Sequence, residues 1–321
     1  MEVNMRRLFL LSRFVVPALF ALFASAIISS AGEDNIRPPA AAGSFYPGSP
    51  SELKSMISSL LDKCPEETPA GDVLAAMAPH AGYVYSGAVA AHTFKQLAHI
   101  DFDTIVIIGH DSYQDCVAFI SPADYFRTPL GLVQVDREMV DKLLKFNKGI
   151  RSDESVHSQD QSVEIQLPFL QVMGKKCKIV PILFGDPTAK NCRILADAII
   201  AAAGDKKVFV LSSTDMSHYP AYEDARKVDN ATLEMVKAMD VDKLFSHLDA
   251  QVAKKTISGL QTALCSRGGA GAAIFFAKAR GADQAQILDY ANSGDVAIGD
   301  KSRVVGYSSV LFVKKPNPVK P

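Results

Sequence analysis

Several side chains that bind metals or transfer protons follow short apolar runs of this 321-residue sequence. Three such runs, each typical of a β-strand, end just before His80, before His110, and before the pair Asp215 and His218. In an open α/β sheet the carboxyl ends of the strands meet at one crevice, so residues far apart in the sequence could lie together there. Cys265 precedes a run of small residues typical of a helix and could face the same crevice. The pattern indicates one active site or metal site.

His80 lies in the sequence Pro79-His80-Ala81-Gly82. Pro79 restricts the backbone, and Gly82 permits a tight turn or the close approach of a ligand. The alternative is a histidine that only forms a hydrogen bond with a carbonyl group of the turn. For a single histidine this alternative is the commoner case, so the functional interpretation depends on the other candidates.

Asp215 and His218 are three residues apart and follow the apolar run Val208–Leu211. At this spacing a carboxylate and an imidazole share one side of a helical turn. Asp215 would then orient the ring of His218 and raise its basicity, which predicts an acid/base pair. The alternative is an Asp/Ser turn that only caps a helix.

Cys265 is followed by Arg267 and by two glycines that open the predicted helix Gly268–Ala279. A nearby cation and the amino end of a helix both favour the thiolate form of cysteine. A thiolate together with two imidazoles is a suitable ligand set for iron, copper or zinc. The alternative is a small buried apolar residue, which is the usual role of a free cysteine.

The acidic and amide-rich segment 153–164 contains one more candidate, His157. The segment is expected to enter a helix with Asp160 or Ser162 as the cap. His157 could reach the crevice and act in catalysis, whereas Glu164 is expected to make structural hydrogen bonds. The remaining histidines are interpreted as structural or surface residues: His92, His99 and His247.

Alternating strands and helices must position these side chains. A βαβ unit is predicted from the strand Val73–Ala78, the helix Gly87–Leu97 and the strand Thr104–Ile108, and its continuous apolar strands suit a sheet buried on both faces. Further strands are expected at Val117–Ile120, Leu130–Val135, Cys177–Phe184, Lys207–Leu211, Ile287–Ala291 and Val304–Val313, and further helices at Ser51–Leu61, Arg137–Phe146, Val163–Met173, Ala189–Ala203, Ala221–Met239 and Val241–Leu248.

No internal repeat or domain linker interrupts this alternation. The sequence therefore predicts a single three-layer α/β domain with a mostly parallel central sheet. We expect this domain to span residues 32–314 and a flexible tail to span residues 315–321.

The composition restricts the class of partner. The sequence is 48% hydrophobic and has a formal net charge of -1. Nucleic-acid binding requires a clustered basic surface, so this charge argues against a nucleic acid as the main partner. The basic clusters Lys175-Lys176 and Lys206-Lys207 are interpreted as solvated loop residues. A small molecule or a peptide is the expected ligand.

Residues 1–31 have the pattern of a secretory signal peptide. Arg6, Arg7 and Arg13 precede the apolar stretch Phe14–Ile28, and small residues precede Gly32. The pattern predicts cleavage and an exported protein, either periplasmic or extracellular. The alternative is an uncleaved membrane anchor, although the stretch is short for a span of about 20 residues. In that case the protein would contact the membrane only through residues 1–31.

The five cysteines are scattered and odd in number, which is not the pattern of a disulfide framework. A pair such as Cys177 with Cys192 is left open by the sequence. At least one thiol is expected to stay free, and Cys265 is the candidate because of its surroundings.

The sequence resembles the Memo family, the B component of the AmmeMemoRadiSam group, over nearly all of residues 37–313. The resemblance is carried by a series of ordered motifs: Ala42-Gly43-Ser44-Phe45-Tyr46, Ala78-Pro79-His80-Ala81-Gly82-Tyr83, Tyr125-Phe126-Arg127-Thr128-Pro129-Leu130, Val163-Glu164-Ile165-Gln166-Leu167-Pro168, Ser212-Ser213-Thr214-Asp215-Met216-Ser217-His218-Tyr219 and the Cys265 segment. It implies a fold similar to that of the class III extradiol (LigB-type) non-haem iron dioxygenases.

The resemblance also implies a metal pocket. The family uses the histidine of its Ala-Pro-His-Ala-Gly motif, a histidine after the second strand, and a cysteine; the first and last correspond to His80 and Cys265. The family's Gly-Pro-Asn/Ser-His appears here as Gly109-His110-Asp111-Ser112, so Ser112 stands at the ligand position. His110, two residues earlier, is the candidate that could replace the missing ligand.

A second departure from the family lies at Gln161, within Asp160-Gln161-Ser162, where the family usually has Glu-His-Ser. An amide cannot titrate near neutral pH as an imidazole does. His157 matches another histidine that is common in bacterial members, and Asp215 and His218 resemble the acid/base region of the dioxygenases. The departures leave open a degenerate site.

Three functions are consistent with the sequence. The first is an exported metal-binding protein that holds iron or copper, with zinc as a further candidate, and oxidises a small aromatic or other oxidisable compound. The second is a non-catalytic binding or scaffold protein with a degenerate site. The third is a protein that sequesters metal or protects against redox damage outside the cytoplasm.

Overall fold

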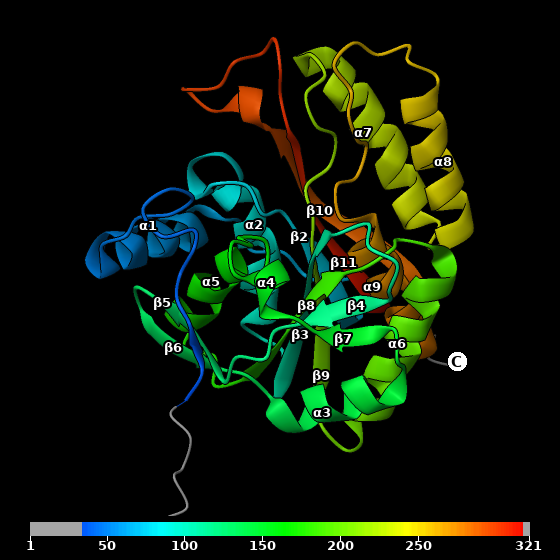
Figure 1. Ribbon diagram of the computed structural model, residues 1–321. Coiled ribbons are helices and arrows are strands. Elements are labelled where there is room, and N and C mark those ends of the chain that lie inside the picture. The colour runs from blue at the N-terminus through cyan, green and yellow to red at the C-terminus, as the bar shows by residue number, and fades with distance from the viewer. Residues whose placement is uncertain (1–33, 317–321) are drawn as a thin grey trace, which may run out of the picture. The chain divides into compact units, whose positions relative to one another are not determined.

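The computed structural model describes residues 34–316, whose centre is an eight-stranded sheet (Figure 1). In spatial order its strands are β10 (Gln284–Asn292), β11 (Gly306–Lys314), β2 (Asp72–Ala78), β9 (Val208–Ser213), β3 (Thr104–Asp111), β8 (Lys178–Phe184), β4 (Ala118–Ile120) and β7 (Ile150–Ser152). The central strands β2, β9, β3 and β8 are parallel, whereas β10, β11 and β4 pair in antiparallel fashion. The predicted mostly parallel sheet is confirmed.

Helices cover both faces of this sheet (Figure 1). One layer contains α1 (Pro50–Lys63), α2 (Tyr83–Leu97) and α5 (Leu167–Val172), and the other contains α6 (Ala189–Ala203), α8 (Val241–Ala253) and α9 (Arg267–Ala279). The helix α3 (Arg137–Phe146) packs on α6, and α7 (Tyr222–Lys237) packs on α8 and β10. The chain therefore forms the predicted three-layer α/β fold.

The central strands are buried because their sequences are continuously apolar. The first six residues of β3 and the last four of β2 are buried, so neither strand shows the alternation of a half-exposed sheet. Fully burying a large aliphatic side chain contributes about 1.5–3 kcal/mol. This core holds the carboxyl ends of β2, β9 and β3 next to one another.

A second, small sheet consists of β1 (Ile36–Arg37), β5 (Tyr125–Thr128) and β6 (Gly131–Gln134). The strand expected at Leu130–Val135 is confirmed as β6, whereas β1 and β5 were not predicted. Strands as short as β1 and β5 carry too few residues to show a hydrophobic period, which explains why the sequence did not reveal them. The short helices α4 (Glu154–His157), η1 (Glu164–Gln166) and η2 (Ser293–Asp295) complete the described fold.

Several predicted helix boundaries differ from the structure, and three of the differences concern the layer that contains α1, α2 and α5. The helix expected to begin at Gly87 begins at Tyr83, because Gly87 lies inside α2, where it permits close packing against Leu60. Ser49, followed by Pro50, precedes α1 instead of the predicted cap Ser51. The single helix expected at 163–173 is divided into η1 and α5. The first correction matters for function, because α2 begins directly after the motif that carries His80.

The predicted signal peptide or anchor, residues 1–31, lies outside the described residues, as does most of the predicted tail. Within residues 34–316, the helices are too short or too polar to cross a membrane. All five cysteines are free, so the pair Cys177 and Cys192 that the sequence left open is not formed. Cys192 is buried in α6, where its thiol lies 3.3 Å from the carbonyl oxygen of Gly268.

Candidate metal site

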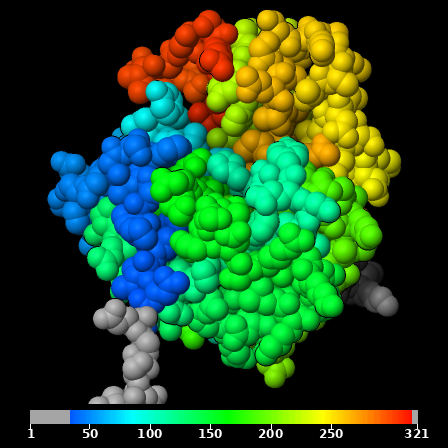
Figure 2. Space-filling model, in the orientation of Figure 1, coloured from blue at the N-terminus to red at the C-terminus, as the bar shows by residue number. Residues whose placement is uncertain are grey.

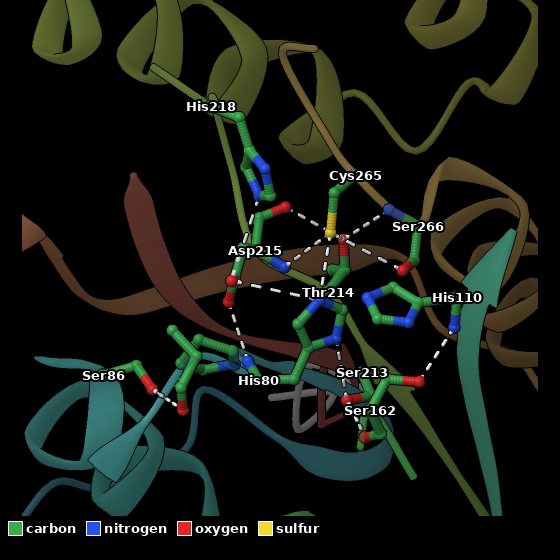
Figure 3. Close-up of polar contacts among 12 residues, drawn as sticks. His80, Ser86, His110, Ser162, Ser213, Thr214, Asp215, His218, Cys265 and Ser266 are labelled. Carbon is green, nitrogen blue, oxygen red and sulfur yellow. Dashed lines mark hydrogen bonds and ion pairs between the residues drawn. The ribbon is translucent and has the colours of Figure 1, made fainter. Parts of the chain in front are cut away.

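Five of the six predicted reactive side chains, all except His157, converge at the carboxyl ends of three neighbouring parallel strands (Figure 3). His80 follows β2, His110 lies at the end of β3, and Asp215 and His218 follow β9. Cys265 lies two residues before the start of α9. Figure 2 shows the face of the molecule on which the segments near residues 85 (cyan), 220 (yellow-green) and 265 (orange) come together.

His80, His110 and Cys265 form a compact cluster of metal-ligating atoms. One ligand atom from each residue lies within 4.8 Å of the other two. The sulfur of Cys265 lies 3.2 Å from Nε2 of His80, and the two imidazole rings lie 4.5 Å apart, edge to face. Bonds of about 2.0–2.3 Å from nitrogen and sulfur to one ion place its ligand atoms roughly 3–4 Å apart. The cluster could therefore bind one metal ion after its widest separation closes slightly.

The hydrogen bonds around His80 decide which ring nitrogen is free. The hydroxyl of Ser213 donates its only proton to the carbonyl oxygen of Ser162 at 2.6 Å, and it accepts from the side-chain amide of Gln166 at 2.7 Å. Its remaining lone pair can only accept from Nδ1 of His80, 3.2 Å away. Nδ1 therefore carries the proton, and Nε2 presents a lone pair beside Cys265.

A carboxylate sets the same tautomer in His110. Nδ1 of His110 lies 3.1 Å from Oδ1 of the buried Asp160. Burial alone would raise the pKa of Asp160, but the hydrogen bond and charge of His110, with further donors from Val163 and Ser162, hold that pKa well below its usual value. An ionised Asp160 only accepts hydrogen bonds, so Nδ1 is the donor and Nε2 is free for a metal.

A β-bulge aims His110 at the cluster. The pairing of β3 with β8 shifts register between Ile108 and Asp111, and such a bulge redirects side chains near the end of a strand. A Cβ atom on Gly109 would lie 2.1 Å from Oγ of Ser162, so only glycine fits there. The same hydroxyl accepts the backbone N–H of His110 at 3.0 Å. His110 thus joins His80 and Cys265 in the cluster.

The thiol of Cys265 has polar neighbours. The backbone N–H of Asp215 donates to Sγ at 3.3 Å, and the hydroxyls of Ser266 and Thr214 lie 3.6 and 3.8 Å away. Such donors stabilise negative charge on sulfur. The sequence predicted that Arg267 would stabilise a thiolate at Cys265. The guanidinium of Arg267 instead forms an ion pair with Asp249 at 2.5 Å.

The chain has the motifs of a known family along most of its length. A family model described as Memo-like protein matches residues 37–311. MEMO1 family proteins of Archaeoglobus fulgidus, Methanobrevibacter smithii and Saccharolobus solfataricus are 37%, 36% and 35% identical, each over 86% of this chain and 99% of the relative. The chain belongs to the Memo family. The resemblance on which the ligand positions His80 and Cys265 rest is thereby confirmed.

Asp215 of this Memo protein lies between two histidines. Its Oδ2 lies 3.9 Å from Nε2 of His80 and 4.0 Å from Nε2 of His218, and its Oδ1 accepts the backbone N–H of His80 at 2.7 Å. Within residues 34–316, Nε2 of His218 is buried without a hydrogen-bond partner, and it points toward Asp215 (Figure 3). The side chain of His218 is 23% exposed, and that of His110 is 37% exposed, so solvent reaches the cluster.

The helical turn predicted for residues 215–218 is wrong. The segment is extended, and His218 forms β-bridges with Thr262 and Val305. The backbone N–H of Met216 donates to Gly306, and that of His218 donates to Thr262, so neighbouring segments take the hydrogen bonds that a helix would need. Asp215 still faces His218, but through an extended chain.

His157 of the Memo protein lies in a packed position. Its ring is fully buried with Nε2 3.1 Å from the carbonyl oxygen of Phe119, and burial lowers its pKa to about 4. The backbone carbonyl of His157 accepts two hydrogen bonds from Arg37. Within residues 34–316, its hydrogen bonds do not join it to the cluster. A catalytic role for His157 stays a prediction, whereas the structure shows its part in packing.

Glu164 makes the structural hydrogen bonds that the sequence predicted. It is fully buried and accepts from the guanidinium of Arg37 at 2.7 Å, from the hydroxyl of Tyr46 at 2.5 Å and from the backbone of Ala40 and Ala41. This network ties the start of the described chain to segment 157–164. Since that segment contains Asp160, the network supports the orientation of His110.

Sequence reasoning missed the residues that orient the two histidines. Asp160 was expected only as a helix cap, and Ser213 and Gln166 were noted only as parts of motifs. No local pattern links these residues to His80 or His110, because the hydrogen bonds join segments 47 to 133 residues apart. The one available signal was their place within the motifs of the Memo family.

Proposed function

We propose that this Memo protein binds one redox-capable metal ion, iron or copper, through Nε2 of His80, Nε2 of His110 and Sγ of Cys265. The observation that carries the proposal is the pair of tautomers, since both histidines donate from Nδ1 and so keep Nε2 as the free ring nitrogen, and Nε2 of His80 lies 3.2 Å from the sulfur of Cys265. Two imidazoles and a thiolate form a soft-to-borderline donor set that suits iron and copper, and zinc as well.

Three protein ligands leave further coordination positions for a substrate, as in catalytic metal sites. A bound iron or copper would supply redox and Lewis-acid chemistry to a small oxidisable molecule. His218 would accept or donate a proton at Nε2, and Asp215 would stabilise its protonated ring. Nε2 of His218 has no competing hydrogen-bond partner within the described chain, which supports this role.

We infer export from residues 1–31, whose basic and apolar pattern is that of a signal peptide. The protein would then act in the periplasm or outside the cell. If these residues are retained, they would anchor it to the membrane instead. The first alternative predicts that five free thiols meet an oxidising compartment, where a bound metal would protect Cys265.

Metal analysis of the purified protein tests the proposal. The protein is prepared anaerobically without tags or chelators, together with His80→Ala, His110→Ala and Cys265→Ser. The exposed His99 and the partly exposed Cys177 provide matched controls, as His99→Ala and Cys177→Ser. We expect near-stoichiometric iron or copper in the wild type and the controls and its loss in the three site variants. Equal metal content in all six proteins would overturn the proposal.

Metal sequestration without turnover, the third function that the sequence left open, is the alternative proposal. It is favoured by Gln161, an amide at the position where the family usually has a proton-carrying histidine. Oxygen uptake separates the two functions once metal is bound. The redox proposal predicts substrate-dependent uptake that His218→Ala abolishes while metal stays bound, whereas sequestration predicts metal and no uptake.

A further inference from the structure

A groove of about 260 Å³ is lined in part by residues that are close in the chain to His110 and Cys265. Its walls come from three parts of the chain: Tyr113 in the connection after β3, Leu248 and Val252 on α8, and the segment that ends at Leu264. None of these side chains takes part in the metal cluster or in the proposed proton transfer. The groove is therefore a feature that the proposed function does not yet use.

The groove is built from the same segments as the site. Leu264 directly precedes Cys265, and Tyr113 follows His110 by three residues. The carbonyl oxygen of Thr262, another wall residue, accepts the backbone N–H of His218 at 3.0 Å. A molecule in the groove would contact segments that hold a proposed metal ligand and the proposed proton carrier.

Tyr113 is an exposed aromatic residue with a strained backbone. Its side chain is 66% exposed although it is large and aromatic, and its φ angle is 56°, in the left-handed region. This conformation costs a residue with a Cβ atom roughly 1–2 kcal/mol. Two hydrogen bonds hold it in place, from Ser112 N–H to Phe184 and from Tyr113 N–H to Gly185. Strain that the surroundings maintain in this way is concentrated at ligand sites.

The charge of the groove limits what it can bind. Its only two charged wall residues, Asp249 and Arg267, pair with each other at 2.5 Å. The guanidinium of Arg267 also lies over the ring of Phe245, 4.7 Å from its centre. The two charges therefore compensate each other. Of the other seven wall residues, Gln261 and Thr262 are polar and none is charged, so the groove favours an uncharged molecule over an ion.

We propose that this groove is the specificity subsite of the Memo protein and binds an uncharged, largely apolar part of the substrate against the ring of Tyr113. The assignment rests on the proposed function, because it places the reacting part of the same molecule at the cluster. A flat ring or chain packed on an exposed, rigidly held tyrosine loses little conformational freedom of the protein on binding.

Binding of a small probe to the metal-free protein tests the subsite. The probe is 4-methylphenol, and the matched charged probe is 4-methylbenzoate; both are titrated by NMR into the wild type, Tyr113→Ala and Tyr113→Phe. Phe146→Ala is the control, because Phe146 is 46% exposed and lies on α3, outside the groove. We expect 4-methylphenol to bind the wild type, Tyr113→Phe and the control alike and at least about fivefold more weakly to Tyr113→Ala, a loss typical of one aromatic contact.

Equal affinity for Tyr113→Ala and wild type, or tighter binding of 4-methylbenzoate, would overturn the subsite. The titration is repeated on His80→Ala, which is expected to lose metal but to keep the probe. If the wild type binds the probe but never binds metal, the subsite is supported and the metal proposal is contradicted. If the wild type binds metal but not the probe, the metal proposal is supported and the subsite is contradicted.

Discussion

At the scale of single residues, buried hydrogen bonds determine which atom of each histidine can bind a metal. His80 donates to the hydroxyl of Ser213, and His110 donates to the carboxylate of Asp160. These partners do not touch the metal position, yet they fix the ring orientation and the tautomer. Metal ligands depend on such partners for their affinity.

Replacement of Asp160 by Asn tests this dependence. Asn keeps the size of the side chain but removes the charge that holds Nδ1–H of His110, so we expect metal affinity to fall about 10- to 100-fold. Competition with a chromophoric chelator measures the affinity. Asp205→Asn, at an exposed position, is the control. Unchanged affinity in Asp160→Asn would show that the carboxylate does not support the ligand.

Burial of His157 predicts that the folded protein loses stability at acidic pH. Burial lowers its pKa from 6.5 to about 4, so between these values the unfolded chain binds a proton that the folded chain does not. The stability that neutral His157 provides is complete above pH 6.5 and is lost as the pH falls toward 4. Urea unfolding of metal-free protein at pH 7 and pH 5 should show a loss in wild type that exceeds the loss in His157→Gln by about 2 kcal/mol.

The comparison between the two proteins isolates His157. Burial raises the pKa of Asp111 and of Asp229 to about 7, and these groups change stability in the opposite direction as the pH falls. They are present in both proteins, so their effect cancels in the difference. His99→Gln, an exposed histidine, should behave like the wild type. If the free energy of unfolding depends on pH in the same way in wild type and in His157→Gln, burial of His157 does not cause the loss of stability at acidic pH.

At the scale of elements, the end of β3 decides whether His110 reaches the cluster. The bulge between Ile108 and Asp111 needs Gly109, because any side chain there would collide with Ser162. We expect Gly109→Ala to destabilise the protein by about 1–3 kcal/mol and to lower its metal content. Urea unfolding and metal analysis measure the two effects.

Gly48→Ala is the matched control for this variant. A Cβ atom on Gly48 would meet its nearest neighbours at 3.6 Å, an ordinary contact, and Gly48 lies outside the cluster. We expect its stability and metal content to stay close to those of the wild type. Normal metal content in Gly109→Ala would mean that the bulge is not needed to aim His110.

The elements were predicted from the sequence more completely than the site. The pattern of apolar residues predicted the helices α3 and α6 with their observed boundaries. Continuous apolar runs predicted the central strands. The helical turn at Asp215 was wrong because tertiary hydrogen bonds decide its conformation. The aim of His110 could not be predicted, because it follows from a bulge and from a hydroxyl 52 residues away.

At the scale of the whole molecule, one domain of the Memo family carries both unusual ligand geometry and the groove at Tyr113. The family match covers residues 37–311, so the fold is the part that this protein shares with its relatives. Folds of this kind host different functions through changes in the residues at their sites. We interpret Ser112 and Gln161 as such changes, and His110 as compensation for the first.

The pattern of residues 1–31 predicts where the mature protein begins. We expect residues 1–31 to be removed in the native host, so that the mature chain begins at Gly32. Intact-mass measurement of the protein purified from a soluble extracytoplasmic fraction tests this directly. The mass of the full 321-residue chain in the membrane fraction would instead support an uncleaved anchor.

X-ray absorption spectroscopy of the metal-loaded protein tests the central claim most directly. A site built from His80, His110 and Cys265 predicts two imidazole nitrogens at about 2.0–2.1 Å and one sulfur at about 2.3 Å from the metal. It also predicts that the sulfur disappears in Cys265→Ser and that one imidazole disappears in His110→Ala, whereas Cys177→Ser keeps the wild-type spectrum. A wild-type spectrum without sulfur, or a sulfur that persists in Cys265→Ser, would contradict a site built from His80, His110 and Cys265.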